Sequence, residues 1–419
     1  DYYASRGLGD VYKRQILVLW LSCISLSATL AASTICRNAL YLAAFIALID
    51  LVIKRTPVKW NAGFTVVLLT LLLSLSLALS TWLYPSVTFF RIDENYAETA
   101  KRLFVGSITT FYLILHRDKI SSKGWVGAYF WVTVGFIYTT ILAIKISSPY
   151  ARLEINTVAT MTAYVFIVLS LATTFGVLKI RGWMKPFSVI GIIAITCYML
   201  VLTQTRSVLL TYPLLVLALL YKEKFFTKRN SAMLLAILII AAVFSLPKIN
   251  KAIDRIADSA TEYEAYKNNN DNTSLGARFS MWKAGFFATG NSPLGESADR
   301  RDTLARQYIL KHENGNPEAI RSIKNHYHND LLEAITLRGW LGLITLLAFY
   351  IGTAVASRRF TGTYSTTLLL IVPTVIYGST DTLLIDHRYV TILVLLMPFY
   401  LCSEAKKHPV ASTTDSATH

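Results

Sequence analysis

The sequence predicts an all-α polytopic membrane protein with about twelve transmembrane helices and one large helical loop outside the cytoplasm. Of the 419 residues, 54% are hydrophobic and the mean hydropathy is +0.46, which is too apolar for a soluble globule. The apolar runs are near 20 residues long, and this length favours helices over the short alternating strands of a barrel. A single long polar insert interrupts the apolar runs late in the chain. A large soluble excursion between membrane spans is typical of a protein that acts at the membrane surface.

The apolar runs divide the chain into membrane and non-membrane parts. Helices 1–9 of about twelve are expected in residues 16–246, and helices 10–12 in residues 331–402. The polar insert, residues 247–330, is predicted to be the large extracytoplasmic loop, which would be periplasmic in a Gram-negative cell, and residues 403–419 a cytoplasmic tail. Residues 1–15 are neither apolar nor periodic, so we expect a disordered or artefactual start. The approximate spans are 16–33, 39–53, 62–84, 99–115, 125–144, 157–178, 187–202, 207–220, 231–246, 333–356, 366–380 and 389–402.

The charge pattern predicts the side that each loop faces. The net charge is +16, and most lysines and arginines stand in short clusters between spans. Such clusters favour the cytoplasm, so this charge indicates membrane topology rather than binding to nucleic acid. Every second loop is basic, which places both termini in the cytoplasm and the insert outside it. The four cysteines lie in or beside apolar spans and predict neither a disulfide framework nor a thiolate zinc site.

Arg206 is the first candidate for chemistry. It stands in a polar break, Thr203 to Ser207, between two apolar runs and at the predicted outer face. An ionisable residue at membrane depth is costly and by default indicates function. One alternative is an arginine that snorkels to lipid headgroups. The hydrogen-bonding neighbours, Gln204 among them, favour instead a guanidinium that grips a phosphate.

The insert supplies further arginines. Arg278 lies at the start of an amphipathic segment that Asn272, Thr273 or Ser274 could cap as a helix. A solvated arginine on a surface helix is the alternative for Arg278. Farther along, Arg300, Arg301 and Arg306 stand among acidic residues, and most of these are expected to form solvated ion pairs.

The end of the insert carries two histidines in the run His-Tyr-His-Asn, residues 326–329. His326 and His328 share a face only if the segment is extended, since on a helix they would lie about 200° apart. Asn329 is a good cap for a helix that begins after it, and that cap places His328 at the helix entrance. A general base is favoured, because imidazole can take a proton from a sugar hydroxyl near neutral pH. A structural histidine and a metal ligand are the alternatives, although no third ligand is evident and we expect no metal site.

At these residues the chain resembles the O-antigen ligases of Gram-negative bacteria, within a superfamily that includes the O-antigen polymerases. The resemblance covers essentially the whole chain after residue 15, in hydropathy layout and size. It is closest in three segments, which are LTQTR at 202–206, TSLGAR at 273–278 and HYHN with the following DLLEA at 326–334.

The resemblance implies a catalytic set of His328, Arg206 and Arg278. It further implies a glycosyltransferase of lipopolysaccharide assembly, in the bacterial inner membrane with its active site facing the periplasm. Its partners would be O-antigen linked to undecaprenyl pyrophosphate, the lipid A core oligosaccharide and membrane lipids, with no nucleic acid. Polymer would pass to a sugar hydroxyl of the core, without metal or other cofactor and with inversion.

Other residues of the same segments are expected to contact the substrates. These residues are His326, Arg301, Arg300, Gln204 and Asn329. Two alternative functions stay open at this point. An O-antigen polymerase would join lipid-linked repeats, and a lipid-linked sugar flippase would also have many spans. The flippase is less favoured, because the polar candidates gather at one face rather than near the midplane.

Overall fold

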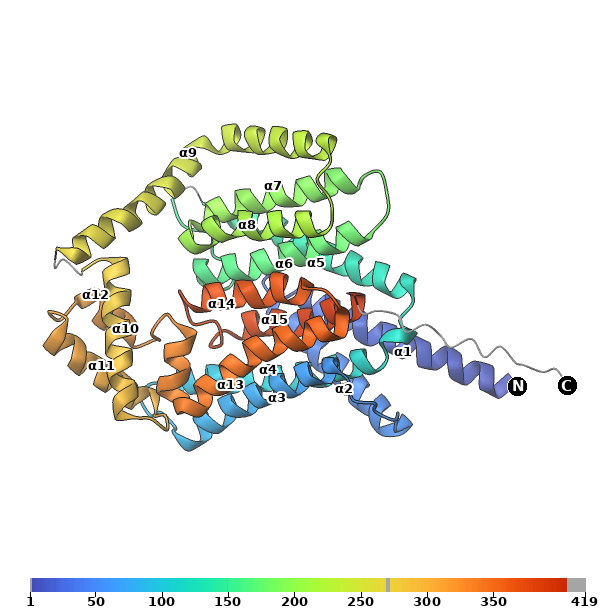
Figure 1. Cartoon of the computed structure of the whole chain (residues 1–419), viewed down its shortest axis with the longest axis horizontal. Helices are drawn as coiled ribbons and strands as arrows, with labels where there is room; N and C mark the ends of the chain where they lie inside the picture. Colours follow the sequence, from blue (N-terminus) through green and yellow to red (C-terminus); the bar gives the residue numbers. More distant parts are fainter. Residues whose placement is uncertain (1, 149, 269–271, 405–419) are drawn as a thin grey trace.

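The fold is known from a computed structural model, which describes residues 2–148, 150–268 and 272–404. Within these ranges all regular structure is helical (Figure 1). The helices are α1 (Tyr2–Ser27), α2 (Ser33–Lys54), α3 (Ala62–Leu83), α4 (Phe90–Leu115), α5 (Ser122–Ile146), α6 (Ala159–Lys179), α7 (Lys185–Thr203), α8 (Arg206–Lys222), α9 (Lys228–Lys267), α10 (Ser274–Asn291), α11 (Ala298–His312), α12 (Pro317–Ile323), α13 (Asp330–Thr361), α14 (Val372–Gly378) and α15 (His387–Glu404). Short helical turns precede α5 at Arg117–Lys119 and α14 at Thr367–Ile371.

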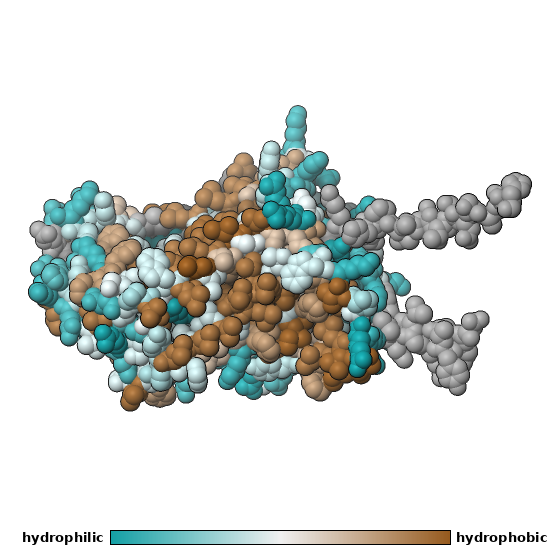
Figure 2. All heavy atoms as spheres, turned by 60° about the horizontal axis from the view of Figure 1, so that its bottom comes forward, coloured by the Kyte–Doolittle hydropathy of each residue, from teal (hydrophilic) through white to brown (hydrophobic). Residues whose placement is uncertain are grey.

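Membrane-spanning character is carried by the long apolar helices. Six of the described helices are long and apolar enough to cross a membrane, namely α2, α3, α5, α6, α7 and α13. The other expected spans also coincide with helical segments, although they do not meet the same length and hydropathy. Figure 2 shows the result on one face, where a hydrophobic belt lies between two hydrophilic ends. The chain is therefore an all-helical, multi-pass membrane protein, and the number of crossings stays a prediction.

The core of the bundle is built around α6. Within its most apolar window, 94% of the residues are buried inside the protein. Buried aromatic rings join this helix to its neighbours, as in the stacked pair of Tyr164 and Tyr377 with centroids 4.6 Å apart. A helix that is apolar on all sides is expected at the centre of a bundle, because it finds partners in every direction.

The expected insert is helical, as predicted. It contains α10, α11, α12 and the distal part of α9, and Figure 1 shows α10–α12 gathered at one end of the bundle. Residues such as Met281, Ile309, Ile323 and Tyr327 form a small hydrophobic cluster separate from that of the bundle. The insert therefore has a core of its own.

Away from α9, the insert contacts the bundle at the start of α4 and at Gly339 of α13, among other places. The carboxylate of Asp299 accepts hydrogen bonds from the backbone N–H groups of Val87 (2.6 Å) and Phe89 (2.9 Å), just before α4 begins. Free N–H groups at a helix start are natural partners for a carboxylate. The second contact lies at Gly339, where α13 departs from helical geometry with φ 64°. A Cβ at Gly339 would lie 2.5 Å from the carbonyl oxygen of Pro293, so only glycine lets this insert loop approach.

The expectation of a disordered or artefactual start concerns residues 1–15. The backbone of residues 2–15 is helical and continues into the first apolar run as α1. The guanidinium of Arg14 pairs with Asp50 of α2 at 2.9 Å, and this contact holds the beginning of the apolar run against its neighbour. Of the expected tail, residues 403–419, the first two residues end α15 and the others lie outside the described residues.

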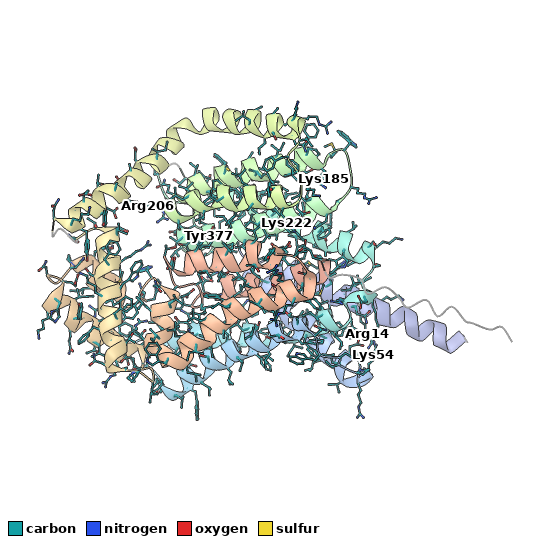
Figure 3. The ribbon with its side chains drawn as sticks, viewed as in Figure 1. Arg14, Lys54, Lys185, Arg206, Lys222 and Tyr377 are labelled. Carbon is teal, nitrogen blue, oxygen red and sulfur yellow. The ribbon has the colours of Figure 1, made fainter. Side chains whose placement is uncertain are left out.

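The basic loops gather at the end opposite to the insert. Figure 3 shows Arg14, Lys54, Lys185 and Lys222 far from Arg206. This arrangement is what the alternation of basic loops predicted. Which side of the membrane each end faces remains a prediction.

Candidate active site

Arg206 is held by a tight turn between α7 and α8. Gln204 ends α7 in the left-handed conformation with φ 51°, and Arg206 is the first residue of α8. Arg152 braces this turn, because its guanidinium donates to the carbonyl of Thr203 at 2.8 Å and to Oγ1 of Thr205 at 3.1 Å. The start of α8 is thereby fixed at the insert end of the bundle.

The guanidinium of Arg206 contacts the distal part of α9. It donates to Oε1 of Glu262 at 2.7 Å and to Oγ of Ser259 at 3.0 Å. The other oxygen of Glu262 accepts from the backbone N–H of Leu275 at 2.8 Å. Burial raises the pKa of Glu262, but these hydrogen bonds outweigh burial and leave the pKa below its ordinary value. A carboxylate therefore occupies the position at Arg206 that an anionic ligand would take.

Arg278 lies across the same cavity. It is in the first turns of α10, which Thr273 caps by accepting the N–H of Gly276 at 3.0 Å, as the sequence predicted. Within the described residues, the side chain of Arg278 forms no hydrogen bond or ion pair. The cavity measures about 730 Å³, and both arginines line it. Its other lining residues include Arg152, Thr160, Tyr164, Gln204, Arg321 and Thr380.

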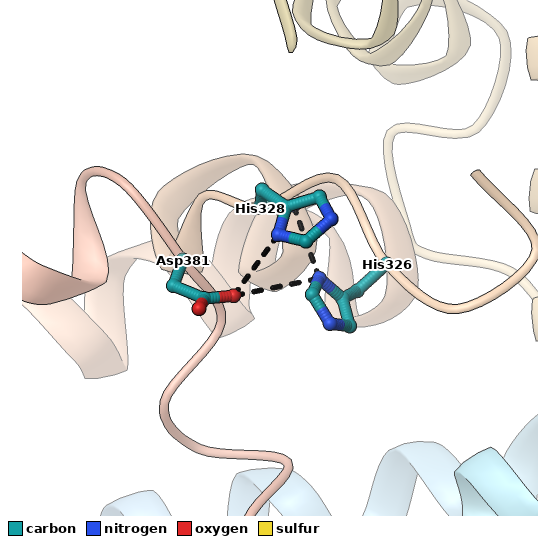
Figure 4. A group of neighbouring side chains, drawn as sticks. All are labelled: His326, His328 and Asp381. Carbon is teal, nitrogen blue, oxygen red and sulfur yellow. Dashed lines mark hydrogen bonds and ion pairs between the residues drawn. The ribbon is translucent and has the colours of Figure 1, made fainter. Parts of the chain in front are cut away.

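The two histidines form a compact cluster with Asp381 (Figure 4). His328 adopts φ 52°, and this turn brings its ring to 4.2 Å from that of His326. The backbone N–H of His328 donates to Nδ1 of His326 at 3.2 Å, and Nδ1 of His328 lies 3.0 Å from Oδ1 of Asp381. The segment is thus non-helical at the histidines, and a left-handed turn at His328, rather than an extended run, brings the two rings together.

The loop that carries Asp381 is held by three successive residues of the His-Tyr-His-Asn-Asp run. His328 contacts Asp381 itself, and Asn329 donates to the carbonyl of Ser379 at 3.3 Å. Asp330 accepts the N–H of Leu383 at 3.0 Å. Each contact fixes the same loop, between α14 and α15, against the start of α13. The position of Asp381 beside His328 is therefore determined by the backbone on both sides.

Charge and burial define the protonation of the cluster. Burial lowers the pKa of His326 to about 3, and the neighbouring His328, Arg301 and Arg278 add to this effect while Asp381 opposes it. Burial raises the pKa of Asp381, but the hydrogen bond from His328 and the surrounding positive charges hold it below its usual range. An ionised Asp381 favours the tautomer of His328 that carries its proton on Nδ1. Nε2 of His328 is then available as a base.

The histidines and arginines lie in adjoining cavities rather than in a single one. His326, His328 and Asp381 line a second cavity of about 720 Å³. Thr160 lines both cavities. Thr380 lines the arginine cavity, and the next residue, Asp381, lines the histidine cavity. The charge of Arg278 acts on both His326 and Asp381. The three residues expected to be catalytic thus lie at the same end of the bundle, across a shared wall.

Comparisons with known proteins agree with this arrangement. A family profile described as O-antigen ligase matches residues 190–347, which include Arg206, Arg278 and both histidines. The chain is 27% identical to the O-antigen ligase of Escherichia coli K12 over 317 residues, which cover 73% of this chain and 74% of that protein. It is also 29% identical over 195 residues to an uncharacterized protein of Haemophilus influenzae, covering 43% and 47% of the two chains.

Residues 190–347 therefore match the O-antigen ligase family, within a chain that is similar to an O-antigen ligase over most of its length. This placement supports an enzyme that transfers glycosyl groups in lipopolysaccharide assembly. The O-antigen ligase profile ends before Asp381, so the carboxylate beside His328 comes from outside the matched range.

The residues expected to contact substrates occupy different surroundings. His326 and Gln204 line the two cavities. Asn329 caps α13 as predicted, by accepting the N–H groups of Leu331 and Leu332. Arg300 points to solvent, with 64% of its side chain exposed and Glu296 3.5 Å away. Neither Arg300 nor Asn329 lines a described cavity wall.

Arg301 differs most from the expectation, because its side chain is fully buried. It pairs with Glu333, and its other guanidinium nitrogen faces the carbonyls of Ile323 and Asn325 at 3.3 Å. The second oxygen of Glu333 accepts the N–H of Tyr327 at 3.1 Å. The pair therefore holds the backbone on both sides of His326, which indicates a positioning role rather than contact with substrate.

Replacing Arg301 with Met should destabilise the insert by about 3–5 kcal/mol, because Glu333 would stay buried without its partner. Limited proteolysis of the insert in the membrane-embedded protein measures this loss. The double variant with Glu333→Gln should recover part of the resistance, whereas Arg300→Ala should change it little because Arg300 is exposed. Equal protease resistance in Arg301→Met and the native protein would contradict the positioning role.

Three residues of the site were not singled out from the sequence. They are Asp381, Arg152 and Glu262, and each contacts a catalytic candidate or its supporting turn. The one available signal was the polar run at 379–388 between two apolar spans, which holds Asp381 and Asp386. Arg152 and Glu262 carry no local signal, because their partners are distant in sequence.

The cluster also has the composition of a metal site, contrary to the expectation of no candidate. One ligand atom from each of His326, His328 and Asp381 lies within 4.8 Å of the others. The direct contact between His328 and Asp381, at 3.0 Å, already satisfies both groups without an ion. The geometry can therefore serve either a hydrogen-bonded pair or a metal.

Treatment with a chelator distinguishes a hydrogen-bonded His328–Asp381 pair from a metal centre. We expect incubation of the purified protein with EDTA, followed by removal of the chelator, to leave the transfer rate unchanged. The reason is that His328 needs a free Nε2 to act as a base, and a bound metal would compete for the same imidazole. Loss of activity that returns on addition of Zn²⁺ or Mn²⁺ would show that the cluster works as a metal centre.

Proposed function

We propose that this chain is a ligase that moves O-antigen polysaccharide from undecaprenyl pyrophosphate to a sugar hydroxyl of the lipid A core, at the periplasmic face of the bacterial inner membrane. The observation that carries the proposal is the pairing of a carboxylate-supported histidine with an arginine cavity beside it. The family placement supports the same reaction class.

The histidine supplies the base. In this proposal Nε2 of His328 takes the proton of the acceptor hydroxyl while Asp381 stabilises the imidazolium that forms. The acceptor oxygen then attacks the anomeric carbon of the donor. The bond from that carbon to the pyrophosphate oxygen breaks in the same step, and the configuration inverts.

The arginines receive the leaving group. Charge builds on the pyrophosphate as the bond breaks, and guanidinium groups fixed in advance stabilise that charge without a metal. Arg278 has no competing partner in the described part of the chain. Arg206 would exchange the carboxylate of Glu262 for a phosphate, since both anions fit its planar donor group. The donor thus sits on the arginine side of the shared wall and the acceptor on the histidine side.

A purified reaction tests this proposal. The full chain in detergent is given lipid-linked polymer and lipid A core, with no nucleotide and no ion gradient. We expect polymer to appear on the core, as a shift of the core band on a gel. Joining of lipid-linked repeats to one another, without use of the core, would indicate a polymerase. No covalent product from verified substrates would contradict transfer and favour transport.

A deletion strain gives an independent answer in cells. Loss of a ligase should leave long polymer on its lipid carrier and bare core in the outer membrane. Loss of a polymerase should leave single repeats attached to core. The two outcomes differ in the length of polymer on core, which silver-stained lipopolysaccharide gels resolve.

A further inference from the structure

A groove with two cations at its mouth lies at the end of the bundle opposite to the candidate active site. A groove of about 350 Å³ opens between α5 and α7, beside the end of α6. Its walls are apolar and outward-facing, with Val126 54% and Phe130 58% exposed. Both residues belong to α5, which is long and apolar enough to span a membrane. The groove therefore faces lipid rather than water.

Two cations stand at the mouth of this groove, Arg181 and Lys185. Neither side chain forms an ion pair or hydrogen bond with any residue that the structure describes. Their neighbours at the same end behave differently, because Lys179 and Lys222 both pair with Glu223 and Glu404. Glu223 and Glu404 are thus already paired with other lysines. The positive charges of Arg181 and Lys185 at the groove therefore stay without an acidic partner among the described residues.

Trp183, which lies between the two cations in the sequence, is typical of the membrane surface. Trp183 is 79% exposed and follows Arg181 by two positions. Tryptophan is enriched where a helix end meets the headgroup layer, since its ring is apolar and its N–H is polar. The mouth of the groove thus lies at headgroup depth, and the apolar walls continue from there along the first turns of α5 toward Thr133.

We propose that this groove binds one anionic phospholipid from the leaflet at this end of the bundle. Its phosphate would lie between Arg181 and Lys185, and an acyl chain would lie along Val126 and Phe130. Basic pockets between transmembrane helices are suited to such headgroups. Charge complementarity selects an anionic lipid, and the apolar walls select a lipid over a soluble anion.

Lipid titration of the full chain in detergent tests the site. Phosphatidylglycerol and phosphatidylcholine with identical acyl chains are added, and retained lipid is counted by native mass spectrometry. We expect retention of phosphatidylglycerol only. Each cation near an anionic headgroup strengthens binding about fivefold, so Arg181→Ala with Lys185→Ala should weaken it roughly thirtyfold.

A matched control removes the same charge from the same end. Lys228 and Arg229 are exposed at the start of α9 and do not line the groove. Lys228→Ala with Arg229→Ala should keep the native affinity for phosphatidylglycerol. Equal losses in the two double variants would overturn the proposal, because they would mean that only overall charge matters.

A neutral variant tests the acyl part and guards against misfolding of the charge variant. Ser188 lines the groove and is exposed, so Ser188→Phe should obstruct the chain without altering charge. We expect this variant to lose phosphatidylglycerol as well. The proposal also fails if phosphatidylcholine is retained equally, or if glycerol 3-phosphate displaces the lipid at equal concentration, since either result removes the need for one of the two parts.

Discussion

Replacing His328 with Ala should lower the transfer rate by roughly a hundredfold to ten-thousandfold, the usual contribution of a general base. The protein should remain folded in the membrane, because the side chain of His328 contacts Asp381 and His326 but closes no hydrophobic core. The measurement is polymer transferred to core by purified protein at several pH values. Cells that carry the variant should display core without polymer.

His312 provides a matched control for this substitution. It lies on the same insert and is exposed, with its ring 4.9 Å from that of Tyr308. His312→Ala should keep the native rate. Transfer by His328→Ala at the native rate would remove the base from the mechanism while leaving the family placement intact. A loss shared by His312→Ala would indicate instead that the insert tolerates no change of this kind.

The second large effect is expected at the arginines. Arg278→Ala and Arg206→Ala should each lower the rate about a hundredfold to a thousandfold, as loss of one donor to a developing negative charge does elsewhere. Lysine at either position should restore only part of the rate, because it keeps the charge but not the planar pair of donors. Lys311→Ala, an exposed charge on the insert, is the control and should have no effect.

The two arginines differ in what their loss leaves behind. Arg206→Ala frees the carboxylate of Glu262 in a cavity that must accept pyrophosphate, so repulsion adds to the lost contact. The double variant Arg206→Ala with Glu262→Ala should therefore have a higher kcat/KM than Arg206→Ala alone. For Arg278, which has no partner among the described residues, Glu262→Ala should bring no recovery. Equal behaviour of the two double variants would contradict the exchange of Glu262 for a phosphate.

Much of the fold could be predicted because it depends on local sequence. Apolar runs of sufficient length become helices in a membrane whatever their neighbours are, since backbone polar groups must pair within the chain. Helix caps are local as well, and Thr273 and Asn329 cap the helices that follow them. The break of α13 at Gly339 was not predicted, because it depends on a loop some 45 residues earlier in the chain that needs room there.

The candidate site could be predicted only in part. Its motif residues were recognisable, because an arginine at membrane depth and a histidine beside a helix start are unusual in their local setting. Their partners were not, since Asp381 lies 53 residues from His328 and meets it only after folding. Arg300 and Arg301 are adjacent and chemically identical, yet one is exposed and the other fully buried. Composition alone cannot make that distinction.

The origin of the site residues limits how related ligases can be recombined. Arg206 and Asp381 come from the membrane bundle, whereas Arg278 and His328 come from the insert. A chimeric enzyme that receives a foreign insert would keep half of its own reaction centre and import the other half. Exchange of donor or acceptor preference between two ligases therefore requires the loop after α14 and the α7–α8 turn to travel together with the insert.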